Sequence, residues 1–444
     1  MKMYKLYLFG KNKLFKINRS ITGKGTRLTL KLIKKIIPKL KISNFKSTTK
    51  VFDWKIPYEW NVKNAYVIDK NKRKIIDFKK NNLHLVGYSE PVNKIVSKSN
   101  LFSRIHTLEK QKNLIPYVTS YYKKYWGFCL SHNEKKRLNN KYKNTDKFFV
   151  KVESNFKKDG KLTYGEVLIP GRSKKEILIS TYVCHPSMAN NELSGPLVSI
   201  ALIKFFQKRN NKLSLRFLFV PETIGSIAYI SRNFKSLKKN VIGGYVLTCI
   251  GDNRNYSYLK TKYENSLSDY SARAAFKKLK IKPKYFSFLD RGSDERQFNS
   301  PGVDLNIGSI MRSKYLTYPE YHTSKDDFKL VTPTGLQGGF RAAREAIIQM
   351  QNLYNSDFKT KKKNVIDGYK PKTNFFCEPN MGKRNLYPKI SQKVANYQEV
   401  FNLMNFIQFS DGSNTLKQIA TLAKINYKKT VKIFKILKGK KIIS

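Results

Sequence analysis

Cysteine and histidine are both scarce in this sequence, with four cysteines and five histidines among 444 residues. Cys129, Cys184, Cys249 and Cys377 lie far apart, and no two of them form a Cys-x-x-Cys pair. This spacing indicates neither a zinc ribbon nor a disulfide framework. We therefore expect four buried, reduced thiols.

The sequence also lacks an uncharged apolar stretch of about 18 residues, so no membrane span is predicted. Residues 1–15 alternate lysine with apolar residues. They have neither the continuous apolar segment nor the small-residue cleavage site of a signal peptide. We expect a cytoplasmic protein.

Acidic residues are few: 30 stand against 88 basic residues, which gives a net charge of +58. Such a balance suggests nucleic acid or an anionic membrane as a partner. The excess is mostly lysine, however, and it is spread along a chain that is also rich in asparagine and isoleucine, as in proteins from AT-rich genomes. This compositional interpretation is favoured, and we expect non-specific, salt-dependent binding of polyanions.

Apolar residues make up 40% of the chain and aromatic residues 13%, enough to bury a core, and the length accommodates two or three domains. Residues 1–50 and 115–355 are predicted to form the main domain. Short strand patterns in 51–114 predict an inserted β-rich domain, and 356–389 is predicted to be a connector.

The last segment, 390–444, has three helical patterns and a short wing, which is typical of a winged helix. Winged helices bind DNA or other proteins. We favour a protein-interaction role, because a catalytic-looking region precedes this segment and fold alone does not define function.

Three apolar runs with the character of buried strands each end at a polar residue. The run that begins at Glu176 ends at His185, Leu213–Val220 is followed by Glu222, and Ile242–Ile250 by Asp252. Helical patterns separate the runs, so the fold class is predicted to be α/β with a mostly parallel central sheet. Ligands bind at the carboxyl ends of strands in such sheets.

Metal-assisted hydrolysis needs imidazole or carboxylate ligands and a carboxylate that takes a proton from water. The strand ends and nearby loops supply candidates of both kinds: His185, Glu222, Asp252, His322, Asp294 and Asp326. The alternative for His185 is a strand-end histidine that only bonds the loop backbone. The aromatic segment Tyr117–His132 is either packing between subdomains or a wall of the pocket, and packing is favoured for most of it.

Four motifs carry a resemblance to a known family. They are Cys-His-Pro-Ser-Met-Ala-Asn from 184, Arg-Gly-Ser-Asp-Glu-Arg-Gln from 291, Tyr-Pro-Glu-Tyr-His-Thr-Ser from 318 and Tyr-Trp-Gly-Phe-Cys-Leu-Ser-His from 125. The sequence resembles the zinc aminopeptidase family. It is most similar to a bacterial subfamily with an inserted domain and a C-terminal winged helix, often encoded in polysaccharide-biosynthesis loci. The resemblance implies a three-layer, zinc-peptidase-like core.

The resemblance also implies roles for individual residues. Its histidine ligands match His185 and His322, and its general base matches Glu222. The family's bridging aspartate and two further carboxylate ligands fall on neutral residues, which are Asn191, Thr223 and Thr248. Glu192 and Asp252 are expected to substitute as metal ligands, while Asn191, Asp294 and Asp326 are expected to lie behind the ligands and orient them. These departures leave open one zinc ion, a rearranged site or an inactive relative.

Our first hypothesis is a metal-dependent, aminopeptidase-like hydrolase with one zinc ion. Its substrate would be a small amide: a peptide N-terminus or an amide on an amino sugar or glycan precursor. The alternative is an inactive binding or assembly protein that uses the cleft and the winged helix to bind a protein partner. A nucleic-acid-binding regulator is the third possibility.

Overall fold

A computed structural model describes residues 2–121, 123–354, 368–387 and 397–444. The main domain is built on an eight-stranded sheet in the order β1-β10-β12-β11-β13-β16-β14-β15. Its strands, in that order, are Lys41–Lys46, Lys161–Ile169, Leu213–Val220, Ser173–Tyr182, Val241–Leu247, Ile307–Met311, Ser257–Leu259 and Lys284–Phe286. The four central strands β12, β11, β13 and β16 are parallel, while β1 and β10 at one side are antiparallel. This confirms the predicted α/β class.

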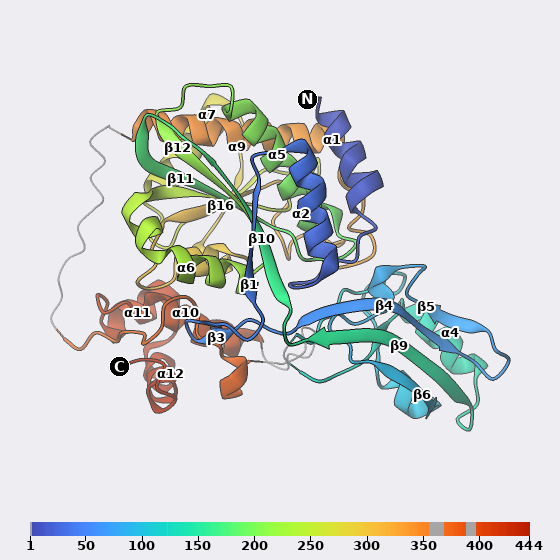
Figure 1. Cartoon of the computed structure of the whole chain (residues 1–444). Helices are drawn as coiled ribbons and strands as arrows, with labels where there is room; N and C mark the ends of the chain where they lie inside the picture. Colours follow the sequence, from blue (N-terminus) through green and yellow to red (C-terminus); the bar gives the residue numbers. More distant parts are fainter. Residues whose placement is uncertain (1, 122, 355–367, 388–396) are drawn as a thin grey trace.

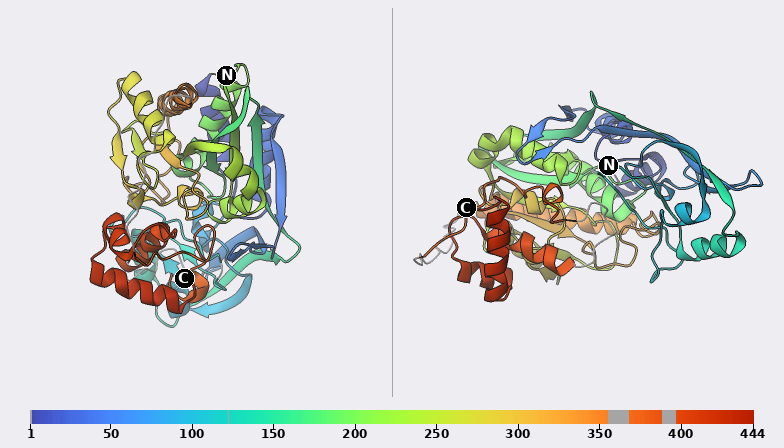
Figure 2. Two further views of the ribbon diagram at one scale, coloured as in Figure 1. Left: turned by 90° about the vertical axis from the view of Figure 1, so that its left-hand side faces the viewer. Right: turned by 90° about the horizontal axis from the view of Figure 1, so that it is seen from below.

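Helices cover both faces of this sheet, as Figures 1 and 2 show. Side chains alternate along the buried strands, so Ile177 and Ile179 pack in one core cluster and Leu178 in another. The first cluster holds helices α1, α2, α5, α7 and α9, and the second holds α6. The three layers predicted from the sequence are therefore present. The helices are α1 Met3–Phe9, α2 Lys24–Ile36, α5 Ser194–Phe206, α6 Ile224–Asn240, α7 Leu267–Lys278, α8 Glu295–Phe298 and α9 Pro333–Leu353, with π-helical turns at Gly10–Leu14 and Ala189–Leu193 and a 3₁₀ turn at Phe288–Asp290.

The inserted part forms an arm at the lower right of Figure 1. Its sheet has the order β5-β4-β9-β6, with strands Lys74–Asp77, Glu59–Ile68, Lys147–Lys157 and Val92–Ser97. Smaller elements complete the region: β2 Lys50–Val51, β3 Trp54–Lys55, β7 Ile105–His106, β8 Phe128–Cys129, α3 Lys98–Phe102, α4 His132–Lys141 and a 3₁₀ turn at Asn82–His84. The longest strand, β9, comes from beyond residue 114, where the sequence placed the end of the insertion. Pairing between β4 and β9 brings it there, and such a long-range pairing is not visible in a local pattern.

The C-terminal helices α10 Tyr397–Phe409, α11 Leu416–Ala423 and α12 Tyr427–Gly439 form the predicted winged helix, which lies below α6 in Figure 1. An antiparallel β-bridge joins Thr373 to Ile443. Thr373, which the sequence placed in the connector, therefore contributes to this domain. A 3₁₀ turn at Gly382–Arg384 belongs to the same segment. Parts of the predicted connector, 356–367 and 388–389, and the predicted first residues of the winged helix, 390–396, lie outside the described residues.

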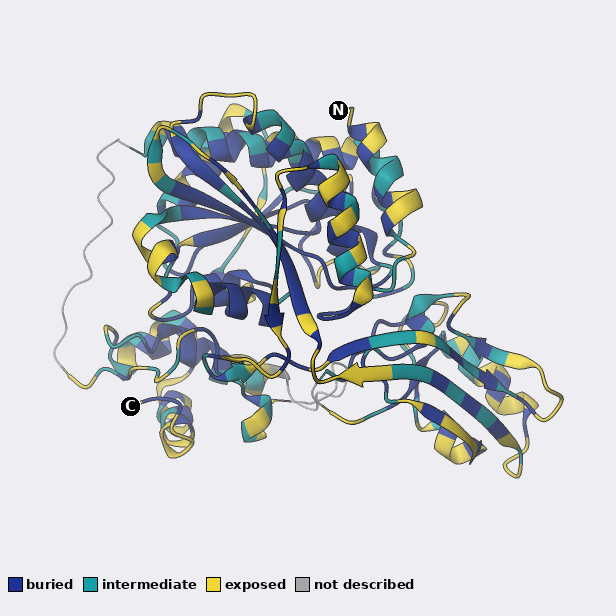
Figure 3. Ribbon diagram, viewed as in Figure 1, coloured by how far each residue is buried: buried dark blue, intermediate teal, exposed yellow. Residues whose placement is uncertain are grey.

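Burial follows these layers, with the central strands buried and the outward faces of the arm and of α12 exposed (Figure 3). All four cysteines are buried and free, as expected. Within the described ranges, no helix is long and apolar enough to cross a membrane.

Candidate metal centre

The carboxyl ends of the parallel strands β11 and β12 lie side by side, because Tyr182 pairs with Val220. The loops that follow these strands carry His185 and Glu222. β13 ends at Leu247, three residues before the end of the predicted run, and Cys249 beyond it has a positive φ of 46°. The sheet thus brings the predicted histidine and the predicted base to one edge, where ligands bind in this class of fold.

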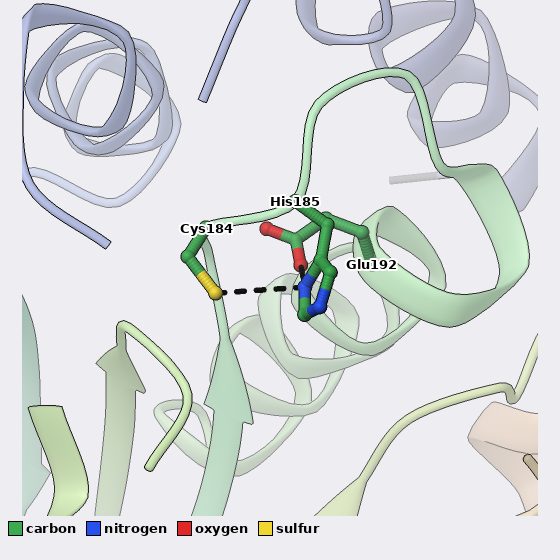
Figure 4. Close-up of side chains that lie close together, drawn as sticks. All are labelled: Cys184, His185 and Glu192. Carbon is green, nitrogen blue, oxygen red and sulfur yellow. Dashed lines mark hydrogen bonds and ion pairs between the residues drawn. The ribbon is translucent and has the colours of Figure 1, made fainter. Parts of the chain in front are cut away.

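His185 is fully buried and is held from behind by a carboxylate (Figure 4). Its Nδ1 lies 2.8 Å from Oε2 of Glu192, and its Nε2 lies 3.6 Å from Oε2 of Glu222. Burial alone would lower the pKa of His185, but the hydrogen bond and the charge of Glu192 raise it overall. Glu192 therefore fixes the ring and leaves Nε2 directed toward Glu222.

Arg19 also belongs to this site, although nothing in the sequence pattern indicates it. Its Nε donates to the backbone oxygen of His185 at 2.9 Å and lies 3.6 Å from Oε1 of Glu192. Both side chains of this ion pair are completely buried. Arg19 comes from a loop 166 residues before His185, and no local motif marks it. A buried arginine neutralises the charge of Glu192.

His322 forms the second half of the site and faces a neutral partner. Its Nε2 lies 3.1 Å from Oδ1 of Asn191, and its ring stacks on Tyr321 with centroids 4.0 Å apart. Burial, with a smaller contribution from nearby His185, lowers the pKa of His322 well below its usual value. The imidazole is therefore neutral, which is the form that binds metals.

Tyr117 lies against both imidazoles, with ring centroids 5.1 Å from His185 and 5.1 Å from His322. Its backbone N–H donates to the carbonyl oxygen of His322. The first residue of the aromatic segment is thus part of the wall of the site, whereas Trp126 and Phe128 of that segment are packed in a core cluster.

Glu222 is positioned by the loop that precedes α8. Ser293 Oγ donates to Glu222 Oε1 at 2.7 Å, and the side chain retains 22% exposure. Burial raises the pKa of this carboxyl group. Asp294, one residue further, accepts from the backbone N–H of Thr223 at 2.7 Å and from Ser226 Oγ at 2.8 Å. These contacts fix the turn that carries Glu222.

Asp326 and Asp252 hold the loop after β11 rather than the histidines. Asp326 accepts from the backbone N–H groups of residues 189, 190 and 191. Asp252 accepts from Asn190 Nδ2 at 3.0 Å and from the N–H and Oγ of Ser313, each at 2.9 Å. Thr248 also bonds this loop, since its Oγ1 donates to the carbonyl oxygen of Asn191 at 2.9 Å. The two carboxylates therefore support the site from outside.

Four non-glycine residues around this edge of the sheet have left-handed backbone angles. Ser187, Thr223, Cys249 and His322 have φ values of 48°, 61°, 46° and 55°. Non-glycine residues rarely adopt such values, and they do so mainly where surrounding structure imposes them at functional sites. Similar angles occur at turns elsewhere, such as Lys72 and Glu264, so the side-chain geometry is what distinguishes this site.

Two groups of side chains at this edge could hold a cation. Cys184, His185 and Glu192 place one ligand atom each within 4.8 Å of one another. In that group, however, His185 uses Nδ1, which Glu192 already binds, and Arg19 lies beside the carboxylate. We therefore consider this group less suitable.

The second group consists of His185 Nε2, His322 Nε2 and Asn191 Oδ1. The two imidazole centroids are 5.3 Å apart. Rings that share a tetrahedral zinc, with Zn–N bonds of about 2.0–2.1 Å, have centres roughly 5 Å apart. The residues present thus fit one transition-metal ion with Glu222 beside it, and Glu192 behind His185 is the usual partner of a ligating histidine.

The winged helix contacts the loop that positions Glu222. Arg291 Nη1 donates to Oδ1 of Asn405 in α10 at 2.6 Å. Glu378 accepts from Gln297 Nε2 at 3.0 Å and from Gln408 Nε2 at 3.1 Å. All these side chains are buried, so the C-terminal domain is fixed to the loop that carries Ser293 and Asp294.

Comparison with solved structures defines the class of the fold as aminopeptidase-like. A zinc aminopeptidase from Bacillus subtilis is similar with a TM-score of 0.59, over 78% of this chain and 94% of its own, at 12% identity. A Peptidase M28 precursor from Shewanella amazonensis has a TM-score of 0.55 over 81% of this chain and 97% of its own, at 9% identity. At these identities the likeness concerns the fold alone.

Residues 10–353 match the family model described as a domain of unknown function, DUF4910, and the chain belongs to this family. Residues 370–444 match a winged helix-turn-helix model. A Clostridium acetobutylicum protein, named as a polysaccharide biosynthesis protein with an aminopeptidase-like domain, is 41% identical over 407 residues, 92% of this chain and 88% of that protein. A crystal structure of a candidate peptidase from that species matches all of this chain and 95% of its own, at 38% identity and a TM-score of 0.74. These matches confirm the predicted family and the winged helix.

Proposed function

We propose that the chain is a metal-dependent, aminopeptidase-like hydrolase of a small amide, with a site for one zinc ion. The observation that carries the proposal is the position of Glu222. Its carboxylate lies 3.6 Å from Nε2 of His185, while Glu192 holds the other nitrogen of that ring. A carboxylate beside a prepared metal ligand is the arrangement that activates water in metallohydrolases.

In this proposal His185, His322 and the amide oxygen of Asn191 hold the metal, and Glu192 acts behind His185. Bound there, zinc would lower the pKa of a water molecule and polarise the amide carbonyl. Glu192 and Asp252 were expected to be ligands. Their hydrogen bonds, to His185 Nδ1 and to Ser313, favour a supporting role for both.

Glu222 is the proposed general base. Its Oε2 faces the site, while Ser293 Oγ occupies Oε1 and fixes the rotamer. The raised pKa of the buried carboxyl group makes it a better proton acceptor than an exposed glutamate. The same group then returns the proton to the leaving amine. Tyr117 and Tyr321 limit access of bulk water to the histidines.

The proposal is tested by incubating the purified full-length protein, loaded with zinc, with aminoacyl amides, dipeptides and N-acyl amino sugars. Release of a free amine by the wild type, and not by Glu222→Gln, is the expected result. If the wild type hydrolyses none of these substrates, the hydrolase proposal fails.

A second candidate function is an inactive member of the fold that binds a ligand or a protein partner. The neutral Asn191, Thr223 and Thr248 at positions where the family has carboxylates favour it. We further propose that the winged helix binds a protein partner and that polyanions bind without specificity. The name of the Clostridium acetobutylicum relative supports a role in polysaccharide biosynthesis for either candidate. Absence of metal after zinc loading would favour the inactive protein.

A further inference from the structure

The loop of residues 15–23 (the Arg19 loop) joins the π-helical turn Gly10–Leu14 to α2. Arg19 is 1% exposed, although arginine is almost never fully buried unless it is paired. Its Nη1 donates to the carbonyl oxygen of Leu14 at 2.7 Å, and its Nε donates to the carbonyl oxygen of His185 at 2.9 Å. The arginine thus joins the Arg19 loop directly to the backbone of a proposed metal ligand.

Arg19 also provides the counter-charge for Glu192. Its Nε lies 3.6 Å from Oε1 of Glu192, while Oε2 of the same carboxylate is bonded to Nδ1 of His185 at 2.8 Å. Among the described residues, no other arginine or lysine is ion-paired with Glu192, and Nη2 of Arg19 and Oε1 of Glu192 are buried without a hydrogen-bond partner. A buried carboxylate that loses its cation is strongly destabilised. The position of Glu192 beside His185 therefore depends on Arg19.

Thr22, three residues further along, attaches the same loop to the arm. Its Oγ1 accepts from the backbone N–H of Trp60 in β4 at 3.2 Å and is hydrogen-bonded to the hydroxyl of Tyr88. Thr22 and Tyr88 are both buried, and the Tyr88 ring stacks on Trp60 with centroids 5.4 Å apart. Gly23 has a φ of 112°, and a Cβ at this position would lie 2.4 Å from the carbonyl oxygen of Trp60. The Arg19 loop is therefore packed closely against the arm.

A second contact from the arm involves Asn82 in its 3₁₀ turn. The Nδ2 of Asn82 donates to the carbonyl oxygen of Lys16 at 3.1 Å and to Ser187 Oγ at 3.0 Å. Lys16 belongs to the Arg19 loop, and Ser187 follows His185 by two residues. Figure 1 shows this junction where β4 begins below α2. The arm thus bonds both of the segments that Arg19 joins.

We propose that Arg19 is a positioning residue for the metal centre and that the arm holds it in place through Thr22 and Tyr88. This inference rests on the proposed function, because it takes His185 as a metal ligand. Ligating histidines usually donate their other ring N–H to a carboxylate, which orients the ring and raises its basicity. Arg19 fixes both that carboxylate and the backbone of the same histidine. The inserted arm then contributes to zinc affinity without contacting the ion.

The zinc affinity of the full-length protein, measured by competition with a chelator, tests the role of Arg19. Arg19→Met removes the charge and both hydrogen bonds, and we expect a loss of roughly 10–100-fold, as for other partners of ligating histidines. Arg19→Lys keeps a charge beside Glu192 and should lose less. It also keeps the test informative if Arg19→Met does not fold.

A spectroscopic measurement separates positioning from a merely structural role. The visible absorption of the cobalt(II)-loaded protein reports the arrangement of the ligands, so it should differ between Arg19→Met and the wild type. A residue that only supports the fold would lower the free energy of unfolding and leave zinc affinity and cobalt absorption unchanged. That result would overturn the proposal.

Tyr88→Phe tests the contribution of the arm. It removes a hydroxyl bonded to Thr22 and should lower zinc affinity by at most about tenfold, the value of one hydrogen bond. In the Arg19→Lys background the further loss should be small, because residues that act through one contact are not additive. Tyr142→Phe is the matched control, since its buried hydroxyl donates to Asp69 at 2.8 Å within the arm. Equal losses from both changes, or a full additional loss in the Arg19→Lys background, would overturn the role of the arm.

These outcomes are separate from those of the proposed function. Zinc binding that depends on Arg19, in a protein that hydrolyses no amide, would support this inference and contradict the hydrolase. Amide hydrolysis with a zinc affinity that the Arg19 variants do not change would do the reverse. Absence of zinc binding by the wild type would overturn both.

Discussion

The two halves of the candidate site differ in charge. His185 is backed by Glu192, which in turn pairs with Arg19, so one imidazole is oriented by a buried carboxylate. His322 faces the neutral amide of Asn191 and is enclosed by the rings of Tyr117 and Tyr321. Both rings are fixed, but only one is fixed by a charged group.

This difference bears on how many cations the site can hold. A second divalent ion would need carboxylates on the His322 side, where the chain has Asn191, Thr223 and Thr248. The charge of Glu192 is balanced by Arg19, which leaves Glu222 as the carboxylate facing the histidines. This is why we propose one ion shared by both histidines.

Removal of either histidine should have the largest effect. Because the two rings are proposed to share one ion, His185→Ala and His322→Ala should each abolish metal binding and activity. Elemental analysis of the purified variants checks this. His132→Ala is the matched control, since His132 lies in α4 of the arm and contacts Thr107. If one histidine variant kept a full metal complement, the rings would not share an ion.

Glu222→Gln should lower the hydrolysis rate by about 10²–10⁴, the usual contribution of a positioned general base, and should leave metal and fold in place. Glutamine keeps the shape and can still accept from Ser293, but it cannot take a proton. Rate measurements and metal analysis of the same sample separate the two roles. Loss of metal as complete as in His185→Ala would make Glu222 a ligand instead.

Glu192→Gln should act through His185 and not through the base. Partners of ligating histidines typically contribute about 10–100-fold to metal affinity, and we expect a loss of that size. Competition with a chelator measures the affinity, and the rate at saturating zinc should recover most of its wild-type value. If the rate stayed low with the site saturated, Glu192 would take part in the chemistry.

Much of the main domain could be predicted, because its strands have local patterns of apolar residues. The buried runs at 176–185 and 213–220 are apolar on both faces and end at polar residues, which is enough to indicate a parallel sheet. The four motifs from residues 125, 184, 291 and 318 carried the resemblance to the aminopeptidases. The membership of β9 in the arm could not be predicted, because it depends on pairing with β4 across the sequence.

The candidate site was predictable in part for the same reason. His185, His322 and Glu222 lie at strand ends or in motifs, and the structure brings them together. Arg19 and Tyr117 reach the site only through tertiary packing, and a single sequence has no signal for that. Whether Glu192 is a metal ligand or a partner of His185 depends on which ring nitrogen of His185 it contacts, and the sequence does not show this.

The smallest effect is expected at the winged helix, which contacts the loop that positions Glu222. Asn405→Ala removes the partner of buried Arg291 and should destabilise the protein by roughly 2 kcal/mol, the value of a hydrogen bond to a charged group. Denaturant unfolding measures this. Glu399→Ala, at an exposed position of the same helix, is the control. If both changes lowered the free energy of unfolding equally, the hydrogen bond between Arg291 and Asn405 would not explain the loss of stability.

The metal content of the wild type tests the single-site account most directly. The untagged protein, loaded with zinc and freed of loosely bound ions, is analysed by plasma mass spectrometry. We expect roughly one zinc per chain, because imidazole is a preferred zinc ligand. Two tightly bound ions per chain would contradict it, as would the absence of any bound ion after loading.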